Sequence, residues 1–374
     1  MSGERKLFGF PFHLLFVKWG PFNHLTNHHS TKHSKLEIEN SKLKIAVLSG
    51  GIGEERDISI QSGNYVTQAL KEAGLNVVAA DIQPDNMDIL KDDSIDVFFV
   101  ALHGKFGEDG QLQQILEDKS LVYTGSGPTA SKLAFDKLAS KKCFNKAGVT
   151  TPKAIKWDPV LQKERKTGTQ FDARTEAKEI EKQLLQLSKR YVVKPVKQGS
   201  TIGVTIVDDP ESALAAARQC LGNFGDCMIE EFIPGREITV GILEKQALPI
   251  IEVRSKTGFY DYQAKYIDDQ TEYLFDTIEN PAVTAKIKAA ALECFDALGC
   301  QHFARVDFRL GNDGIAYALE VNTIPGLTAH SLLPKAAAKA GLSMSDLCIR
   351  IIEAALENEN NRQPLLNQTI KRQK

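Results

Sequence analysis

Residues 304–322 read ARVDFRLGNDGIAYALEVN, and two runs of alternating polar and apolar residues flank the turn sequence GNDG at 311–314. This pattern predicts a β-hairpin, and pairing Leu310 with Ile315 places Arg305 opposite Glu320. One face of this hairpin is apolar and predicts a buried core: Val306, Phe308, Leu310, Ile315, Tyr317, Leu319 and Val321. The other face carries the polar side chains: Arg305, Asp307, Arg309, Glu320 and Asn322.

The polar face of the hairpin has two interpretations. Two carboxylates, an amide oxygen and an arginine form a ligand set for hard divalent cations that hold a phosphate. Alternating polar faces are also ordinary in antiparallel sheets, where they form exposed cross-strand ion pairs. The turn-rich loop TIPGLTAHS at 323–331 follows the last carboxylate directly and would let a substrate approach backbone amides. This loop favours a ligand site.

The composition is that of a soluble globular protein of about two or three domains. The chain has 374 residues, a net charge of −2 and a pI near 6.5, so nothing indicates a general affinity for nucleic acid or anionic lipid. The six cysteines are scattered without a CxxC pair or a metal-ligand spacing. Reduced cysteines of this kind are typical of a cytoplasmic protein.

The first 41 residues differ from the rest of the chain. Leu7 to Val17 is mostly apolar and four histidines follow, which raises the alternatives of a signal peptide, a membrane anchor or a metal-binding segment. The apolar run contains Pro11 and His13, lacks a small-x-small cleavage site and is too short to span a bilayer. We therefore expect residues 1–41 to be a dispensable extension and the protein to have no membrane partner.

Residues 42–130 predict an α/β unit with a parallel sheet, because strand-like and helical runs alternate. The expected strands are 44–48, 77–80, 97–102 and 121–123, with one helix ending at Gly74 and another near 112–116. The polar loops 51–59 and 103–110 then follow strands at their carboxyl ends, where such sheets bind ligands.

Two more units, 131–233 and 234–358, and a polar tail, 359–374, complete the expected organisation. The second unit opens with a helix expected at 131–147, and a later strand leads into the glycine loop VKQGSTIGV at 196–204, whose backbone N–H groups could approach an anion. Neither the GxGxxG fingerprint nor the GxxxxGK[ST] loop occurs in the chain, so nucleotide binding must depend on other residues.

Nine segments, taken in chain order, resemble those of one family, the D-alanine-D-alanine ligases of the ATP-grasp superfamily. They are SGGIGEERDIS (49–59), ALHGKFGEDG (101–110), YTGSG (123–127), FDKLASK (135–141), VKPVKQGSTIGV (193–204), IEEFIPGREITV (229–240), FYDYQAKY (259–266), ARVDF (304–308) and LEVNTIPGLTAHSL (319–332). The resemblance implies an ATP-grasp fold of the α/β class, with an N-terminal parallel-sheet, Rossmann-like domain and two α+β domains that enclose ATP.

The resemblance also implies the reaction. ATP converts the carboxylate of one D-alanine to an acylphosphate, the amine of a second D-alanine attacks it, and the dipeptide enters peptidoglycan precursors. A cytoplasmic homodimer that contacts through its first domain is implied as well.

Roles around the phosphates carry over from the matching motifs. Asp307, Glu320 and Asn322 are expected to bind two Mg²⁺ (or Mn²⁺) ions. Arg305 is expected to stabilise the oxyanion of the tetrahedral intermediate, and it could also pair with Glu320. The expected ATP-binding residues are Lys137, Lys194, Glu230, Phe232, Glu237 and Lys265.

On the substrate side, Glu55 is expected to bind the ammonium of the first D-alanine and to be linked to Ser200 and Tyr266. A neutral His103 could donate a hydrogen bond to the carboxylate of that substrate. The carboxylate of the second D-alanine is expected at Gly326, Ser331 and the amide of Leu332. Thr201 stands where a second serine is common, which predicts tighter loop packing without loss of function.

Two alternatives remain open. D-alanine:D-lactate ligation would need another residue at 266, because a tyrosine after Lys265 resembles the dipeptide-forming type. A non-catalytic nucleotide-binding protein of this fold would be expected to have lost part of the polar hairpin face, and no member of it is lost. The segment 255–271 is expected to be a lid over the site.

Overall fold

The computed structural model describes residues 42–157, 182–255 and 271–372. Residues 1–41 and almost all of the expected lid, with Lys265 and Tyr266, lie outside these ranges. No helix in the described ranges is long and apolar enough to cross a membrane.

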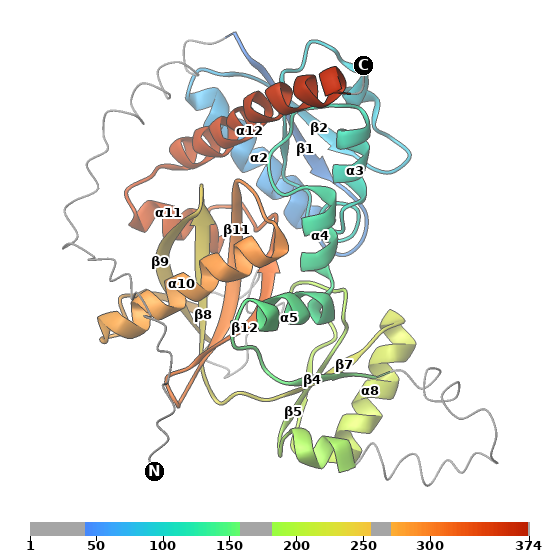
Figure 1. Cartoon of the computed structure of the whole chain (residues 1–374), viewed down its shortest axis with the longest axis vertical. Helices are drawn as coiled ribbons and strands as arrows, with labels where there is room; N and C mark the ends of the chain where they lie inside the picture. Colours follow the sequence, from blue (N-terminus) through green and yellow to red (C-terminus); the bar gives the residue numbers. More distant parts are fainter. Residues whose placement is uncertain (1–41, 158–181, 256–270, 373–374) are drawn as a thin grey trace, which may run out of the picture.

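The N-terminal part is a parallel sheet in the order β2-β1-β3, with helices packed around it (Figure 1). Its elements are β1 (Lys44–Gly50), α2 (Arg56–Glu72), β2 (Asn76–Ile82), the 3-10 helix η1 (Asp88–Lys91), β3 (Val97–Val100) and α3 (Gln111–Asp118). The strand expected at 121–123 is reduced to one bridge between Phe98 and Tyr123. The Ser59 hydroxyl accepts from the Gly50 amide and donates to the Ala101 carbonyl, which ties together the carboxyl ends of β1 and β3.

The central part is an antiparallel sheet in the order β4-β7-β5-β6, covered by helix α8 (Figure 1). Its elements are β4 (Ala154–Lys156), β5 (Tyr191–Lys194), β6 (Thr205–Val207), α8 (Pro210–Phe224) and β7 (Met228–Glu231). The glycine loop 196–204 connects the antiparallel pair β5 and β6. The predicted hairpin around this loop is therefore present.

The C-terminal part is a five-stranded antiparallel sheet in the order β10-β9-β8-β11-β12. Its elements are β8 (Gly235–Leu243), β9 (Gln246–Ser255), β10 (Thr271–Phe275), α10 (Pro281–Leu298), β11 (Phe303–Gly311), β12 (Ala316–Asn322), α11 (Leu332–Lys339) and α12 (Met344–Arg372). α10 packs on the apolar face of β8 and β11, while α12 lies against α2 of the N-terminal part (Figure 1). The backbone of α12 remains helical beyond residue 358, into the segment expected to be a tail.

The helix expected at 131–147 is two helices, α4 (Pro128–Phe135) and α5 (Lys137–Lys146). Asp136 interrupts them with an extended backbone, and its side chain accepts a hydrogen bond from the Ala139 amide. This is an N-cap, which begins a new helix and sets where Lys137 leaves the backbone.

The predicted hairpin register is wrong by one residue from the turn onward, and a β-bulge in β12 shifts it by one residue more. Leu310 pairs with Ala316, Phe308 pairs with Ala318, and Asp307 then pairs with Glu320, so Leu319 is the extra residue. Without the bulge, strict alternation from the buried Ala318 would direct Glu320 into the core. Three residues that we expected in the core are therefore not part of it. Leu319 lines a pocket, Tyr317 is half-buried and Ile315 is exposed.

Candidate active site

The polar face of the β11–β12 hairpin is built as the sequence predicts, although its pairs differ. The bulge brings Asp307 opposite Glu320 and Arg305 opposite Asn322. The Arg305 guanidinium donates to both oxygens of Asp307, at 2.8 and 2.7 Å, so Arg305 pairs with Asp307. Thr239 on β8 donates to Asp307 Oδ1 at 2.7 Å, and Asn322 Nδ2 donates to Oδ2 at 3.1 Å.

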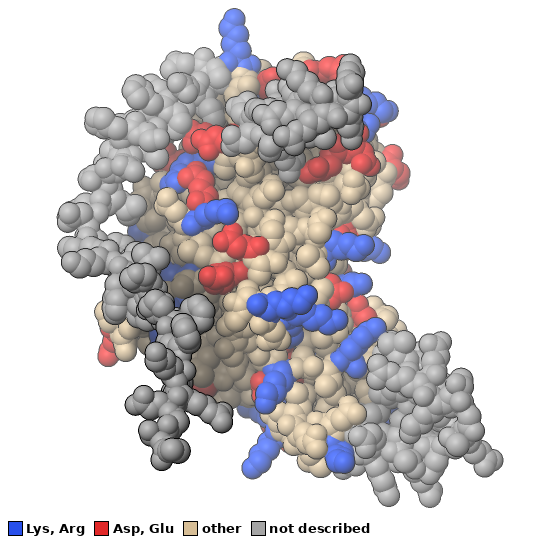
Figure 2. Space-filling model, viewed as in Figure 1, with Lys and Arg blue, Asp and Glu red and all other residues tan. Residues whose placement is uncertain are grey.

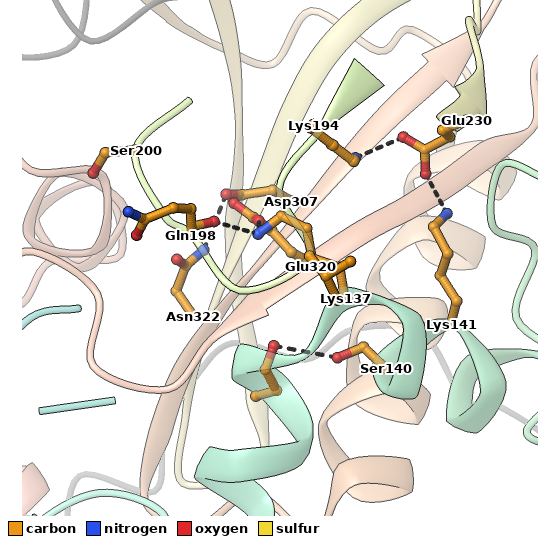
Figure 3. Close-up of polar contacts among 12 residues, drawn as sticks. Lys137, Ser140, Lys141, Lys194, Gln198, Ser200, Glu230, Asp307, Glu320 and Asn322 are labelled. Atoms are coloured by element: carbon orange, nitrogen blue, oxygen red, sulfur yellow. Dashed lines mark hydrogen bonds and ion pairs between the residues drawn. The ribbon is translucent and has the colours of Figure 1, made fainter. Parts of the chain in front are cut away.

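Glu320 is paired with a lysine from another element. Lys137 Nζ, from the first turn of α5, lies 2.7 Å from Glu320 Oε2 and donates to the Gln198 carbonyl at 2.7 Å (Figure 3). The Lys137 backbone amide also donates to the Val196 carbonyl. α5 therefore holds the glycine loop next to the hairpin carboxylates.

Glu230 on β7 is buried between two lysines (Figure 3). Lys194 Nζ from β5 lies 2.6 Å from Glu230 Oε2, and Lys141 from α5 contacts Glu230 Oε1. Burial alone would raise the pKa of Glu230, but Lys194 and Lys141 outweigh it and hold the pKa below its ordinary value. Glu230 is therefore a carboxylate at neutral pH.

A pocket lies between the central sheet and the hairpin. Every described member of the expected ATP set lines it: Lys137, Lys194, Glu230, Phe232 and Glu237. Apolar side chains including Val192, Ile206 and Leu319 line it too, which suits a flat heterocycle. The Phe232 ring stacks with the Arg190 guanidinium, 4.3 Å from the ring centroid, so the aromatic wall is fixed in place.

A second pocket opens on the other side of the same carboxylates. It is lined by Glu55, His103, Glu108, Ser200, Arg305 and Asn322, and by Gly326, Ser331 and Leu332 from the loop after β12. Asp307, Glu320 and Glu237 line both pockets. The two carboxylates of the hairpin thus lie at the boundary between an apolar-walled pocket and a smaller, more polar one.

Glu55, at the start of α2, accepts a hydrogen bond from the Ser200 hydroxyl at 2.6 Å. The expected Glu55–Ser200 link is present, and it joins the N-terminal part to the glycine loop. Ser200 and Thr201 have φ of 52° and 62°, a left-handed conformation that is uncommon outside glycine and strained for a β-branched threonine. The loop is therefore held in a strained shape at the point where it reaches Glu55.

Glu108 is a site residue that we did not predict, although it lies in the motif at 101–110. Its carboxyl group accepts from the backbone amides of Gly104 and Ile324. Burial, with the nearby Glu55 carboxylate as the second cause, raises the pKa of Glu108 to about 8. Glu108 therefore connects the loop 103–110 to the loop after β12.

His103 is buried and has both ring nitrogens engaged. Nδ1 lies 2.9 Å from the Ile324 carbonyl and Nε2 lies 2.9 Å from the Ser62 hydroxyl. Burial lowers the pKa of His103 to about 4, so the ring is neutral and its one N–H is donated to Ile324. His103 therefore holds the loop after β12 and also lines the second pocket, and its donation to a substrate carboxylate stays a prediction.

That loop presents Gly326 and Ser331 to the second pocket. Ser331 precedes the first turn of α11, whose N-terminal amides begin at Leu332 and can attract an anion. A Cβ at position 326 would lie 2.7 Å from Ser331 Oγ, so only glycine leaves this serine in place. Gly326, Ser331 and the amide of Leu332, which we expect to bind a carboxylate, therefore lie together at the second pocket.

The hairpin carboxylates fit a divalent cation by their chemistry. Among the described residues, no three His, Cys, Asp or Glu side chains cluster closely enough to hold a metal. Asp307 and Glu320 nevertheless face each other across the strands, and Asn322 can add an amide oxygen. Arg305 and Lys137 already place positive charge against these two carboxylates. Oxygen donors of this kind suit Mg²⁺ or Mn²⁺.

Comparison with known proteins places the chain among ligases. The family models for the N-terminus and the C-terminus of D-ala D-ala ligase match residues 85–126 and 152–353. A D-alanine--D-alanine ligase of Syntrophotalea carbinolica is 42% identical over 313 residues, which are 83% of this chain and 96% of that protein.

Solved structures agree with this comparison. A D-alanine--D-alanine ligase from Bacillus anthracis complexed with ATP superposes with a TM-score of 0.72 at 33% identity, covering 86% of this chain and 99% of that one. The VanG D-Ala:D-Ser ligase from Enterococcus faecalis has a TM-score of 0.69 at 26% identity, covering 84% and 100%.

The three sheets and the pocket closed by β5, β7 and the β11–β12 hairpin define an ATP-grasp enzyme. Within that class, the chain belongs to the D-alanine-D-alanine ligase family.

Proposed function

We propose that this protein joins two D-alanine molecules with ATP, giving D-alanyl-D-alanine, ADP and phosphate. The observation that supports it most is the sharing of Asp307 and Glu320 by an apolar-walled pocket and a small polar pocket. A phosphoryl group on its way from a nucleotide to an amino acid must cross such a boundary.

The first pocket suits ATP. Phe232 and the apolar side chains pack against adenine, Glu230 and Glu237 accept hydrogen bonds from adenine and ribose, and Lys137 and Lys194 balance phosphate charge. Asp307, Glu320 and Asn322 would hold two Mg²⁺ or Mn²⁺ ions, which when bound neutralise phosphate charge and orient the γ-phosphate.

The second pocket suits the two amino acids. Glu55, held by Ser200, accepts the ammonium of the first D-alanine. The carboxylate of this D-alanine attacks the γ-phosphorus of ATP, ADP leaves, and an acylphosphate remains. The amine of the second D-alanine then attacks the acyl carbon, Arg305 stabilises the oxyanion, and phosphate leaves as the peptide bond forms.

The second amino acid binds through its carboxylate. Ser331 Oγ and the first-turn amides of α11 are the donors on that side of the pocket. Lys265 and Tyr266 keep their sequence-based roles in ATP binding and in closure over the site, and the exclusion of water matters because acylphosphates hydrolyse.

The experiment that tests this function is ADP release by the purified protein with Mg²⁺ and ATP. We expect release to require D-alanine, to fail with L-alanine, and to match dipeptide formation one to one. Release without D-alanine would contradict ligation, and an ester product with D-lactate, or a mixed dipeptide with D-serine, would reassign the second substrate.

Use of the dipeptide for peptidoglycan precursors, a cytoplasmic location and a homodimer through the N-terminal part belong to the same proposal. Light scattering at micromolar protein tests the dimer, since a mass near 41.3 kDa would mean a monomer.

A further inference from the structure

Lys141 is a buried lysine that has no role in the function above. It follows Lys137 by four residues on α5, so the two side chains share one face of the helix. The Lys141 side chain is 6% exposed. Its Nζ contacts three oxygens: Glu230 Oε1, Thr151 Oγ1 at 2.7 Å and the Pro152 carbonyl at 2.8 Å. The contacts to Thr151 and Pro152 are hydrogen bonds and the contact to Glu230 is an ion pair, so this buried cation is surrounded by oxygens.

Glu230 therefore has two cationic partners. Its side chain is 2% exposed, so water cannot compensate its charge, and a buried carboxylate without a counter-ion is costly. Lys194 holds one carboxylate oxygen and Lys141 holds the other (Figure 3).

The two lysines differ in what else they face. Lys194 and Glu230 line the nucleotide pocket, whereas Lys141 is not among the residues that line it. An ATP phosphate that attracts Lys194 would weaken its pair with Glu230. Lys141 lies behind Glu230, where the nucleotide does not compete for it.

We propose that Lys141 is a positioning residue for nucleotide binding: it stays on Glu230 as a fixed counter-ion, so that Lys194 can turn its charge to the phosphates. This inference rests on the proposed function for the identity of the ligand as an adenine nucleotide. The contact of Lys141 with Thr151 supports the role, because Thr151 Oγ1 donates to the Ala318 carbonyl at 2.7 Å and fixes α5 against β12.

The test compares Lys141→Met with Lys142→Met, which removes an exposed lysine from the same helix. We expect Lys141→Met to weaken ADP binding in calorimetry by about tenfold or more. Without Lys141, Glu230 must retain Lys194 as its counter-ion, and Lys194 is then not available to the phosphates. The KM for ATP should rise similarly, the KM for D-alanine should stay within about twofold, and Lys142→Met should match the unmodified protein.

A double-mutant cycle separates this role from a structural one. In a Glu230→Gln background the carboxylate that Lys141 is proposed to hold is absent, so adding Lys141→Met should change the ADP affinity by less than about twofold. The same tenfold loss in both backgrounds would mean that Lys141 acts through Thr151 and β12, and would overturn the proposal.

An unchanged affinity in folded Lys141→Met would overturn it as well. Should that variant fail to fold, Lys141→Arg keeps the charge and should retain ADP affinity within about threefold, and a larger loss in a folded Arg variant would contradict the proposal. ADP binding needs no D-alanine, so the two proposals can fail separately. If the protein binds ADP but makes no dipeptide, only the proposed ligase function is contradicted. If it binds no ADP, both the ligase function and the role of Lys141 are contradicted.

Discussion

Asp307 accepts hydrogen bonds from Arg305, Thr239 and Asn322, while Glu320 is paired with Lys137. Each carboxylate is thus held by groups that belong to different elements. Their backbone neighbours Val306, Phe308 and Val321 are buried in the core beneath them. A change that removes only charge from the polar face should therefore leave that core unchanged.

We predict that Asp307→Asn or Glu320→Gln lowers Mg²⁺-dependent ADP release by about a thousandfold or more, since a metal ligand supplies several kcal/mol of charge stabilisation. The melting temperature should change little. Glu272→Gln, an exposed carboxylate on β10, is the control. Near-normal turnover of either hairpin variant at ordinary Mg²⁺ would remove the metal assignment.

Arg305→Met should slow the chemical step by roughly a hundredfold or more, the scale for losing one oxyanion donor. ATP binding should change far less, because Arg305 lines only the substrate pocket. Rapid-quench measurement of the single-turnover rate, beside calorimetry with ADP, separates the two effects. A collapse of ADP affinity at an unchanged chemical rate would make Arg305 a nucleotide anchor instead.

His103 makes the stability depend on pH. Burial lowers its pKa to about 4, below the ordinary value of 6.5, so between these pH values only the unfolded chain takes up the proton. The contribution of the neutral His103 ring to the free energy of unfolding is therefore fully present above pH 6.5 and is lost as the pH falls toward 4. Urea unfolding should show up to about 3 kcal/mol of this loss in the unmodified protein and not in His103→Gln. Equal pH slopes would contradict the neutral buried ring.

The sequence identified the polar residues of the hairpin but not their partners. Alternation predicts a face, and Arg305, Asp307, Glu320 and Asn322 do share one. Partners such as Lys137 and Thr239 come from segments distant in sequence, and only the packing of α5 and β8 against the hairpin brings them together.

At the scale of elements, two interruptions place the site. The bulge in β12 directs both Leu319 and Glu320 toward the pockets, and the Asp136 cap starts α5 where Lys137 reaches Glu320. Neither could be predicted from periodicity. A bulge adds one residue without a composition signal of its own, and the apolar pattern of 131–147 continues through Asp136.

Removing the Asp136 cap should therefore affect both stability and function. Asp136→Ala is expected to cost about 1 kcal/mol of unfolding free energy and to raise the KM for ATP several-fold by moving Lys137. Asp209→Ala is the matched control, because Asp209 caps α8 by accepting from the Ser212 amide and lies outside both pockets. The control should lose similar stability and keep its KM, and equal KM values for the two variants would show that the cap does not position Lys137.

At the scale of the whole molecule, the site is assembled by packing between the N-terminal and C-terminal parts. α12 packs against α2 in a shared apolar core, and the Ser345 hydroxyl donates to the Ala69 carbonyl. This packing holds the loop 103–110 against the loop after β12, where His103 and Glu108 both contact Ile324.

On the face shown in Figure 2, acidic side chains lie mostly in the upper half, and basic side chains gather lower down, including those over α5. Lys142 and Lys146 of this helix are exposed, while Lys137 and Lys141 are buried against carboxylates. One helix therefore supplies both surface charge and the inner cations of the site.

The central claim, that a phosphoryl group passes from the nucleotide pocket to a D-alanine carboxylate, is tested most directly with D-alanine labelled with ¹⁸O in its carboxylate. An acylphosphate keeps the bridging carboxylate oxygen on phosphorus when the amine attacks the acyl carbon. We predict one ¹⁸O in the released phosphate for each dipeptide formed, measured by mass spectrometry. Dipeptide with unlabelled phosphate, or no dipeptide at all, would contradict the account.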